Sequence, residues 1–183
     1  MAEIVLLAVT KMLAGFCIAG IRPQTGEWVR PVRTFGVLQL GDISYADHRV
    51  LVPFDRADLA LIKPKPQPPH TEDWTWDCLR VRPRRIGHVP EGERLAFLRA
   101  HLAPAPAAIL GAHPPRSLGL AEPSGLEALF ALDQYSGKYE ARLDLPALSP
   151  GRALPVTDLK WRALGRQMIG PQRPALRCSL ADL

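Results

Sequence analysis

Cysteine is scarce in this sequence, and long hydrophobic runs are missing. The three cysteines, Cys17, Cys78 and Cys178, lie far apart and form no Cys-x-x-Cys pair, which argues against a zinc finger or zinc ribbon. Their odd number and wide spacing fit a reducing compartment, so we expect a cytoplasmic protein. No apolar run reaches the ~18 residues that a membrane-spanning helix needs, and Lys11 interrupts the apolar start. We expect residues 1–9 to form a strand rather than a signal peptide, with no membrane association.

The motifs of common enzyme classes are also missing. The chain has no phosphate-binding loop, no dinucleotide-binding fingerprint, no Gly-x-Ser-x-Gly and no His-Glu-x-x-His. A cysteine enzyme with Cys17 as nucleophile and His70 as base is an alternative. However, Cys17 lies in an apolar segment, where a free cysteine usually packs as a small hydrophobic residue. We expect a binding protein that catalyses no reaction and needs no cofactor.

Lysine is rare among the basic residues, whereas arginine is common. Of the 23 basic residues, 18 are Arg and 5 are Lys, and the net charge is +5. Arginine binds phosphate through two parallel hydrogen bonds and stacks on aromatic rings. GC-rich coding also enriches arginine, so the charge favours an anionic partner only modestly. The hydrophobic content of 47% is that of an ordinary globular protein and suffices for a core.

The most informative segment predicts a β-hairpin. Residues 16–21 and 27–32 read as two strands joined by a turn of Pro, Gln, Thr and Gly. Alternation places Trp28, Arg30 and Val32 on one face of the second strand. An aromatic ring beside a guanidinium is common where a small β-barrel stacks a base and neutralises a phosphate. A core tryptophan from which Arg30 extends to solvent explains the pattern equally well.

Short strand patterns recur along the rest of the chain. The further predicted strands are residues 3–9, 50–54, 57–62, 78–86, 117–120, 126–133, 138–145, 153–157 and 176–180. Residues 91–102 form the clearest helical pattern, with leucines at helical spacing, and residues 158–166 read as a helix or turn. Proline-rich stretches at 63–69 and 103–115 interrupt both patterns. Many short strands with few helices predict small β-barrels or a sandwich.

Several motifs resemble those of the dual OB-fold domain family. The strand before Lys11 is followed by Gly-Phe-Cys-Ile-Ala-Gly-Ile at 15–21 and by Thr-Gly-Glu-Trp-Val-Arg-Pro-Val at 25–32. Further similar motifs are Leu61 to Pro64, Pro69-His70, Glu72 to Trp74, Tyr135 to Tyr139, Val156 to Asp158 and Cys178 to Leu180. Thr71 and Asp73 depart from the family's pattern. The resemblance covers most of the chain, with a gap from 91 to 125.

The resemblance implies a mainly β protein with two OB-like barrels, from a family often found near defence and mobile-element genes. We expect the first barrel at residues 1–90, a helix and Pro-rich linker at 91–115, and the second barrel at 116–183. Family members usually have one more strand after the Ser-Leu motif, whereas this chain stops at Leu183, so we expect a short or open second barrel. The family is implied to bind nucleic acid by analogy with other OB folds, although a fold does not fix a function.

We therefore expect a nucleic-acid-binding protein that prefers single strands, with tryptophans stacking bases and cations neutralising phosphates. The candidate interface residues are Lys11, Arg22, Trp28, Arg30, Arg33, Trp74, Arg80, Arg82, Arg84, Lys160, Trp161 and Arg162. Each has a structural alternative: the tryptophans could pack in a core or cap a barrel, and the arginines at 80–84 could form a solvated strand edge. Two other functions stay open, an adaptor or inhibitor in a defence complex and a sensor of a nucleotide-like ligand.

His70, Glu72 and Asp73 lie close together in the sequence and could suggest a metal or acid–base site. A metal needs three or four convergent ligands, which this spacing alone does not provide. We favour a turn in which Asp73 or His70 bonds the backbone, and we expect no metal. Thr157-Asp158 precedes a helical pattern and predicts a helix N-cap or turn.

Overall fold

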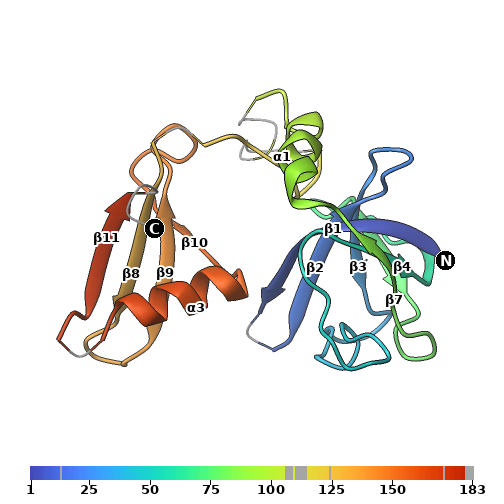
Figure 1. The fold of residues 1–183 in the computed structure, drawn as a ribbon, viewed down its shortest axis with the longest axis horizontal. Helices are drawn as coiled ribbons and strands as arrows, with labels where there is room; N and C mark the ends of the chain where they lie inside the picture. The colour runs from blue at the N-terminus through green and yellow to red at the C-terminus, as the bar shows by residue number, and fades with distance from the viewer. Residues whose placement is uncertain (13, 106–108, 110–114, 124, 171, 180–183) are drawn as a thin grey trace. The chain divides into compact units, whose positions relative to one another are not determined.

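The chain folds into two compact units, Met1–Ala121 and Glu122–Leu183. The structure is a computed structural model that describes residues 1–12, 14–105, 109, 115–123, 125–170 and 172–179 (Figure 1). Strands dominate both units, so the predicted mainly β fold is confirmed. No helix among these described residues is long and apolar enough to cross a membrane.

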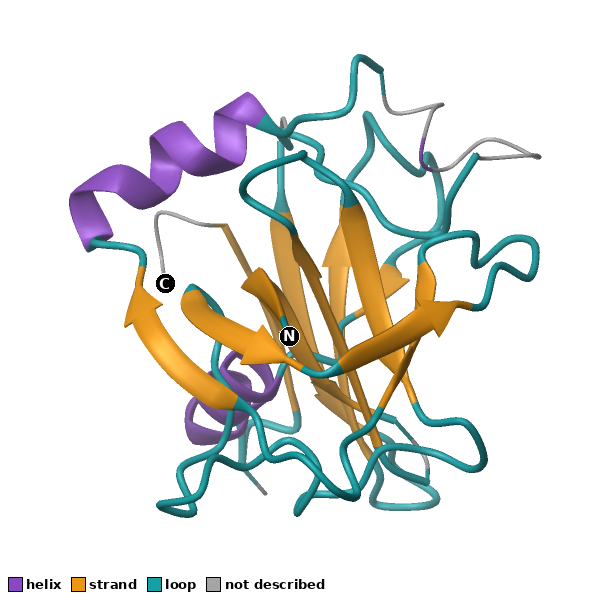
Figure 2. Cartoon of the chain, turned by 90° about the vertical axis from the view of Figure 1, so that its right-hand side faces the viewer, coloured by secondary structure: helices purple, strands orange, loops and turns teal. Residues whose placement is uncertain are grey.

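The first unit contains one seven-stranded sheet. Its strands are β1 (Ala2–Lys11), β2 (Phe16–Ile21), β3 (Trp28–Val32), β4 (Asp55–Leu59), β5 (Leu61–Pro64), β6 (Asp73–Trp76) and β7 (Arg84–His88), in the order β5-β6-β3-β2-β1-β4-β7. Only Ala60 separates β4 from β5, yet β4 pairs with β1 and β5 pairs with β6. β4 and β5 are thus consecutive in the chain but far apart in the strand order. The chain bends at Ala60, and the sheet curls so that its two sides approach each other (Figure 2).

The core of this unit lies inside the curled sheet. Ile4 and Leu6 of β1 point into it, and a bulge between Leu6 and Ala8 shifts the alternation so that Val9 points inward as well. On β3 the alternation is regular, and Val29 is fully buried. Trp76 of β6 fills the centre and is 2% exposed. Trp28 and Arg30 consequently lie on the outer face of β3.

A buried carboxylate ties the β4–β7 side of the sheet together. Asp55 is 1% exposed, and it accepts hydrogen bonds from Tyr45 Oη at 2.9 Å and from Arg85 Nε at 3.0 Å. His88 Nδ1 lies 3.1 Å from the same carboxylate, and Arg94 Nη2 lies 2.8 Å from the other ring nitrogen of His88. This network connects β4, β7 and helix α1 (Glu91–Ala100).

Helix α1 confirms the predicted helix at 91–102, with its end two residues earlier. It contains no buried residue, and Leu95 is 55% exposed. Still within the first unit, Ala103 N–H donates to the Leu120 carbonyl at 2.8 Å. The strand predicted at residues 117–120 is wrong, because these residues form no strand in the structure. The predicted second barrel starts at 116, whereas the compact units divide after Ala121.

Besides 117–120, three strand predictions in the first unit are wrong in whole or in part. The strand predicted at 57–62 is divided at Ala60 between β4 and β5. Residues 50–54 form a loop in which Pro53 lacks an amide hydrogen and Phe54 has a φ of 70°. Residues 78–82 form a turn in which Cys78 is buried and residues 79–82 are exposed. Pro83 precedes β7, so the strand predicted at 78–86 begins only at Arg84. In contrast, β6 was not predicted as a strand.

The second unit is a four-stranded sheet with one helix packed on it. Its elements are β8 (Glu127–Leu132), β9 (Tyr139–Asp144), β10 (Leu154–Pro155), α3 (Leu159–Met168) and β11 (Ala175–Ser179), with the strand order β10-β9-β8-β11. The predicted hairpin around residues 135–137 is confirmed by the pairing of β8 with β9. The predicted N-cap is also confirmed, because the Asp158 carboxylate accepts the Trp161 N–H at 2.8 Å.

Close packing of α3 on this sheet depends on a glycine. Gly165 is buried, and a Cβ built there would overlap the ring of Phe130 and the hydroxyl of Tyr139. The opposite face of the sheet is polar, and Arg177 on β11 lies 3.3 Å from Glu127 and 3.1 Å from Asp144. The helix therefore covers one face of the sheet, while charged side chains occupy the other.

Candidate nucleic-acid interface

The outer face of β2, β3 and β6 brings together side chains that are distant in sequence. Parallel pairing of β3 with β6 sets Arg30 opposite Asp73. The guanidinium donates two hydrogen bonds to this carboxylate, from Nε at 2.6 Å and from Nη2 at 2.9 Å. Arg30 therefore has a bidentate protein partner, and its charge is largely balanced.

Cys17 lies on β2 beside this ion pair. Burial raises the pKa of the Cys17 thiol, and the neighbouring Arg30 only partly opposes this shift. The thiolate, which is the nucleophilic form, is therefore disfavoured at neutral pH. His70, the base in the cysteine-enzyme alternative, has its Nδ1 2.7 Å from Ser117 Oγ.

Next to the Arg30–Asp73 pair is an open pocket of about 320 Å³. It is lined by Gly26, Glu27, Trp28, Thr71, Glu72, Pro115 and Arg116. The Arg116 guanidinium carbon lies 5.5 Å from the centre of the Trp28 ring, which is a cation–π arrangement. Arg116 Nε donates to the Leu118 carbonyl at 2.7 Å, which fixes the orientation of the side chain.

Residues 115–118, here called the 115–118 segment, are hydrogen-bonded to the residues just before β6. Thr71 Oγ1 donates to the Pro115 carbonyl at 2.6 Å. Ser117 N–H donates to Glu72 Oε2 at 3.2 Å, and Ser117 Oγ donates to Glu72 Oε1. Glu72 is 5% exposed, so its carboxylate is buried beneath the segment.

These contacts revise the interpretation of the His70–Asp73 stretch. A turn forms here as expected, but the expected bonds from Asp73 or His70 to the backbone do not: Asp73 bonds the Arg30 side chain, and both His70 and Glu72 contact Ser117. Within the described part of the chain, no three His, Cys, Asp or Glu side chains gather as metal ligands. The stretch holds the 115–118 segment in place.

A second cation–aromatic pair adjoins the pocket. The Arg22 guanidinium carbon lies 4.3 Å from the centre of the Trp74 ring. Glu27 connects this pair to the pocket, since it accepts the Trp74 Nε1 hydrogen bond at 3.2 Å and lies 3.3 Å from Arg22 Nε. Trp74 also packs partly against the core, so only part of its ring is available to a ligand.

The other predicted residues of the first unit lie in three places. Lys11 Nζ lies 4.8 Å from the centre of the Phe16 ring, and Arg33 forms an ion pair with Asp42 at 3.2 Å. Arg80 is exposed in the 78–82 turn, and Arg82 donates to the Gly41 carbonyl at 2.7 Å. Arg84 on β7 pairs with Asp58 on β4 at 2.7 Å, and three strands separate β7 from β3 in the sheet order. The predicted basic strand face at 80–84 is therefore not formed.

The predicted triplet of the second unit is not an open platform. The half-buried Trp161 packs against the apolar core of the unit, with its ring centre 5.9 Å from that of Phe130. Arg162 donates to the Val156 carbonyl at 3.2 Å and to the Tyr139 carbonyl at 3.3 Å. Lys160 is exposed. Trp161 thus has a structural role in packing, which was the alternative to base stacking.

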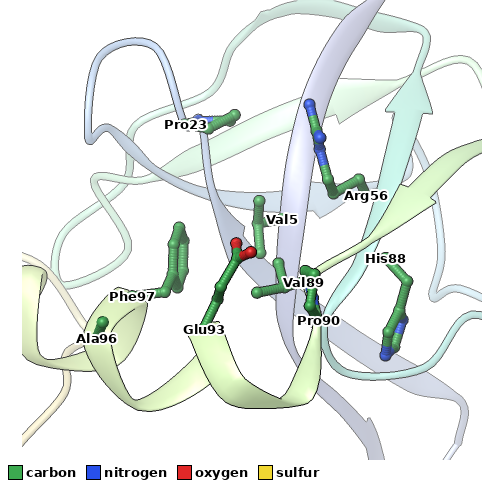
Figure 3. Close-up of a pocket in the computed structure, with 9 residues that line it drawn as sticks. All are labelled: Val5, Pro23, Arg56, His88, Val89, Pro90, Glu93, Ala96 and Phe97. Carbon is green, nitrogen blue, oxygen red and sulfur yellow. The ribbon is translucent and has the colours of Figure 1, made fainter.

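A different pocket, of about 380 Å³, lies between α1 and the outer side of the first sheet. Val5, Pro23, Val89, Pro90, Ala96 and Phe97 supply its apolar walls, with Arg56, His88 and Glu93 beside them. Figure 3 shows Glu93 and Phe97 reaching from the helix toward Val5. Arg56 already pairs with Glu3 at 2.6 Å, and His88 contacts Asp55. This pocket therefore offers little free positive charge to a phosphate.

The fold and this face define a class of protein: a mainly β chain whose first unit is a curled sheet with aromatic rings and arginines on its outer strand surface. The chain belongs to the family of dual OB-containing domains, whose model matches residues 2–183. No curated protein and no solved structure matches the chain. OB folds generally bind nucleic acids.

Arg116 and Ser117 were missed by the sequence analysis. They follow the Pro-rich stretch, and the predicted boundaries place both in the second barrel at 116–183, whereas they belong to the first unit. The signal for their role is spatial, since Ser117 meets Glu72 across 45 residues of sequence. Nothing in local spacing reveals such a contact.

Proposed function

We propose that this protein binds single-stranded nucleic acid without catalysing a reaction, and that the Trp28 pocket is part of the contact surface. The position of Trp28 carries the proposal. Its ring lies on the outer face of β3 and lines an open pocket with a guanidinium above it. A surface tryptophan beside an arginine provides stacking and charge in the combination that unpaired nucleotides require.

Single strands suit this surface better than duplexes. In a duplex the base faces are covered by neighbouring bases, whereas an unpaired base can place its face on Trp28. The pocket is open, so a strand can pass over it. A sensor of a free nucleotide would be better served by an enclosed cavity. We therefore favour a strand over a free small ligand.

Cations near the face supply the electrostatic part of binding. Lys11 lies on β1 next to β2, and Arg116 lines the pocket. Arg30 and Arg33 are paired with Asp73 and Asp42, so their contribution is to balance acidic groups that would otherwise repel phosphates. Binding should consequently weaken as salt rises, with a slope set by the few unpaired cations.

The test is fluorescence anisotropy with labelled single-stranded DNA and RNA oligonucleotides, and with a duplex as comparison. We expect binding that is stronger to single strands and that falls between roughly 50 and 200 mM salt. Trp28→Ala should weaken it by about 1–3 kcal/mol, or about 5- to 140-fold in Kd. Arg30→Ala should also weaken it, because Asp73 would then face the strand unpaired.

Tyr135→Ala is the matched control, because Tyr135 is an aromatic residue that is 99% exposed in a turn of the second unit. It should bind as the wild type does. Absence of binding to either nucleic acid at low salt would refute the proposal and direct the search to a protein partner in a defence complex. Equal affinity of folded Trp28→Ala and wild type would refute the assigned face.

A further inference from the structure

We propose that Trp28 and Arg116 form a clamp for one unpaired base, and that Glu72 and Ser117 are positioning residues that hold Arg116 in the clamp. The inference rests on the proposed function and assigns the part that contacts a single nucleotide. Trp28 provides the stacking surface, and Arg116 provides a guanidinium that closes over the base or binds the adjoining phosphate.

The backbone on both sides of Arg116 is anchored. The Pro115 carbonyl accepts from Thr71 at 2.6 Å, and Ser117 bonds Glu72 through both its N–H and its hydroxyl. Arg116 Nε donates to the Leu118 carbonyl at 2.7 Å. Three consecutive residues are thereby fixed, and the guanidinium is directed to the Trp28 ring.

The donors that remain on Arg116 point to a ligand. A guanidinium carries five N–H groups, and the hydrogen bond to Leu118 uses one. Among the described residues, no hydrogen-bond acceptor lies at the two Nη groups, and Arg116 lines the pocket beside Trp28. These four N–H groups match the paired acceptor oxygens of a phosphate and the acceptor edge of a base.

The buried carboxylate explains why the segment stays in place. Glu72 is nearly inaccessible to water, and both of its oxygens accept hydrogen bonds from Ser117. Undocking the 115–118 segment would leave this carboxylate without those partners, which is unfavourable in a buried position. Glu72 lines the pocket, but both of its carboxylate oxygens accept hydrogen bonds from Ser117, so it acts through Ser117.

A base that enters the pocket replaces the contact between Arg116 and the Trp28 ring with a contact between the base and this ring. The guanidinium now lies over the ring of Trp28, and the arriving base takes this place because its flat face makes a larger contact with the indole. Arg116 then rotates outward and gives up its hydrogen bond to the Leu118 carbonyl, while its backbone stays anchored, and its guanidinium stacks on the base or binds phosphate. The clamp thus requires both a free tryptophan face and a fixed segment.

The experiment measures the affinity for a labelled oligo(dT) of about 12 nucleotides, within the span that one OB fold covers. Arg116→Ala should weaken binding about tenfold or more, and Ser117→Ala should weaken it to a smaller extent. Ser117→Thr keeps the hydroxyl and should restore affinity. Arg49→Ala removes the same charge from an exposed loop residue that pairs with Asp47, and it should bind as the wild type does.

A double-mutant cycle separates positioning from general destabilisation. If Ser117 acts only by placing Arg116, then Ser117→Ala should have no further effect in the Arg116→Ala background. Additive losses would overturn the positioning role. Wild-type affinity in a folded Arg116→Ala variant, with Trp28→Ala still impaired, would overturn the clamp and leave the proposed function standing. Lack of binding by the wild type itself would instead refute the proposed function.

Discussion

Gly165 gives the most direct test of the packing in the second unit. It lies on the side of α3 that faces the sheet, and an added Cβ would overlap Phe130 and the Tyr139 hydroxyl. Phe130 is 1% exposed and Tyr139 is 8% exposed, so neither ring has free space to move into. Gly165→Ala therefore inserts a methyl group into a filled space.

Two opposing effects set the magnitude. Overpacking a core by one carbon costs about 1–3 kcal/mol. Alanine favours a helix over glycine by about 1 kcal/mol. Because the overlap involves buried rings, the packing cost should dominate, and we expect Gly165→Ala to lower the free energy of unfolding by about 1–2 kcal/mol.

Gly92→Ala is the matched control. Gly92 lies in the first turn of α1, and nothing lies within 4 Å of a Cβ built there. The same methyl group should therefore raise the free energy of unfolding by up to about 1 kcal/mol. Urea unfolding followed by circular dichroism compares the two midpoints. A Gly165→Ala protein as stable as the wild type would show that α3 does not pack on the sheet as described.

Two further predictions concern the first unit. Asp55→Ala should lower the free energy of unfolding by about 1–3 kcal/mol, because the buried Tyr45 hydroxyl would lose its hydrogen-bond acceptor; Asp47→Ala, at an exposed ion pair, should leave the urea midpoint unchanged, and equal midpoints for the two variants would contradict the buried network. The alkylation rate of Cys17 should rise only at a higher pH than that of a free cysteine, since burial raises the pKa of its thiol. Arg30→Ala should shift this profile higher still, and a shift to lower pH would disprove the assigned environment.

Much of the fold was predictable because local sequence patterns determine its strands, turns and helix ends. The hairpin of β2 and β3 follows from an apolar run, a Pro–Gly turn and an alternating strand, and the structure places both strands within one residue of the prediction. The N-cap at Asp158 follows from its residue type and the helical pattern after it. The loop at 50–54 was missed because its apolar residues pack on the core without pairing as a strand: Leu51 is 1% exposed.

The site was less predictable than the fold. Trp28 and Arg30 could be placed on one face from alternation alone, but the partner of Arg30 depends on the parallel pairing of β3 with β6 across a long connection. For Trp161 the local pattern was misleading: Lys160 and Arg162 flank it in the sequence and suggested an interface, but its ring packs against the core. Such outcomes are decided by which segments meet in space.

The anchoring of the 115–118 segment also determines how the protein can be divided. Glu72 and Thr71 belong to the barrel, but the groups that satisfy them come from Ser117 and Pro115, after the helix and the Pro-rich stretch. A fragment that stops at residue 90 would lack these groups and expose a carboxylate pocket that the whole chain keeps closed. The smallest self-sufficient form of the first unit therefore ends near Ala121, and a gene fusion or domain exchange should place its junction there.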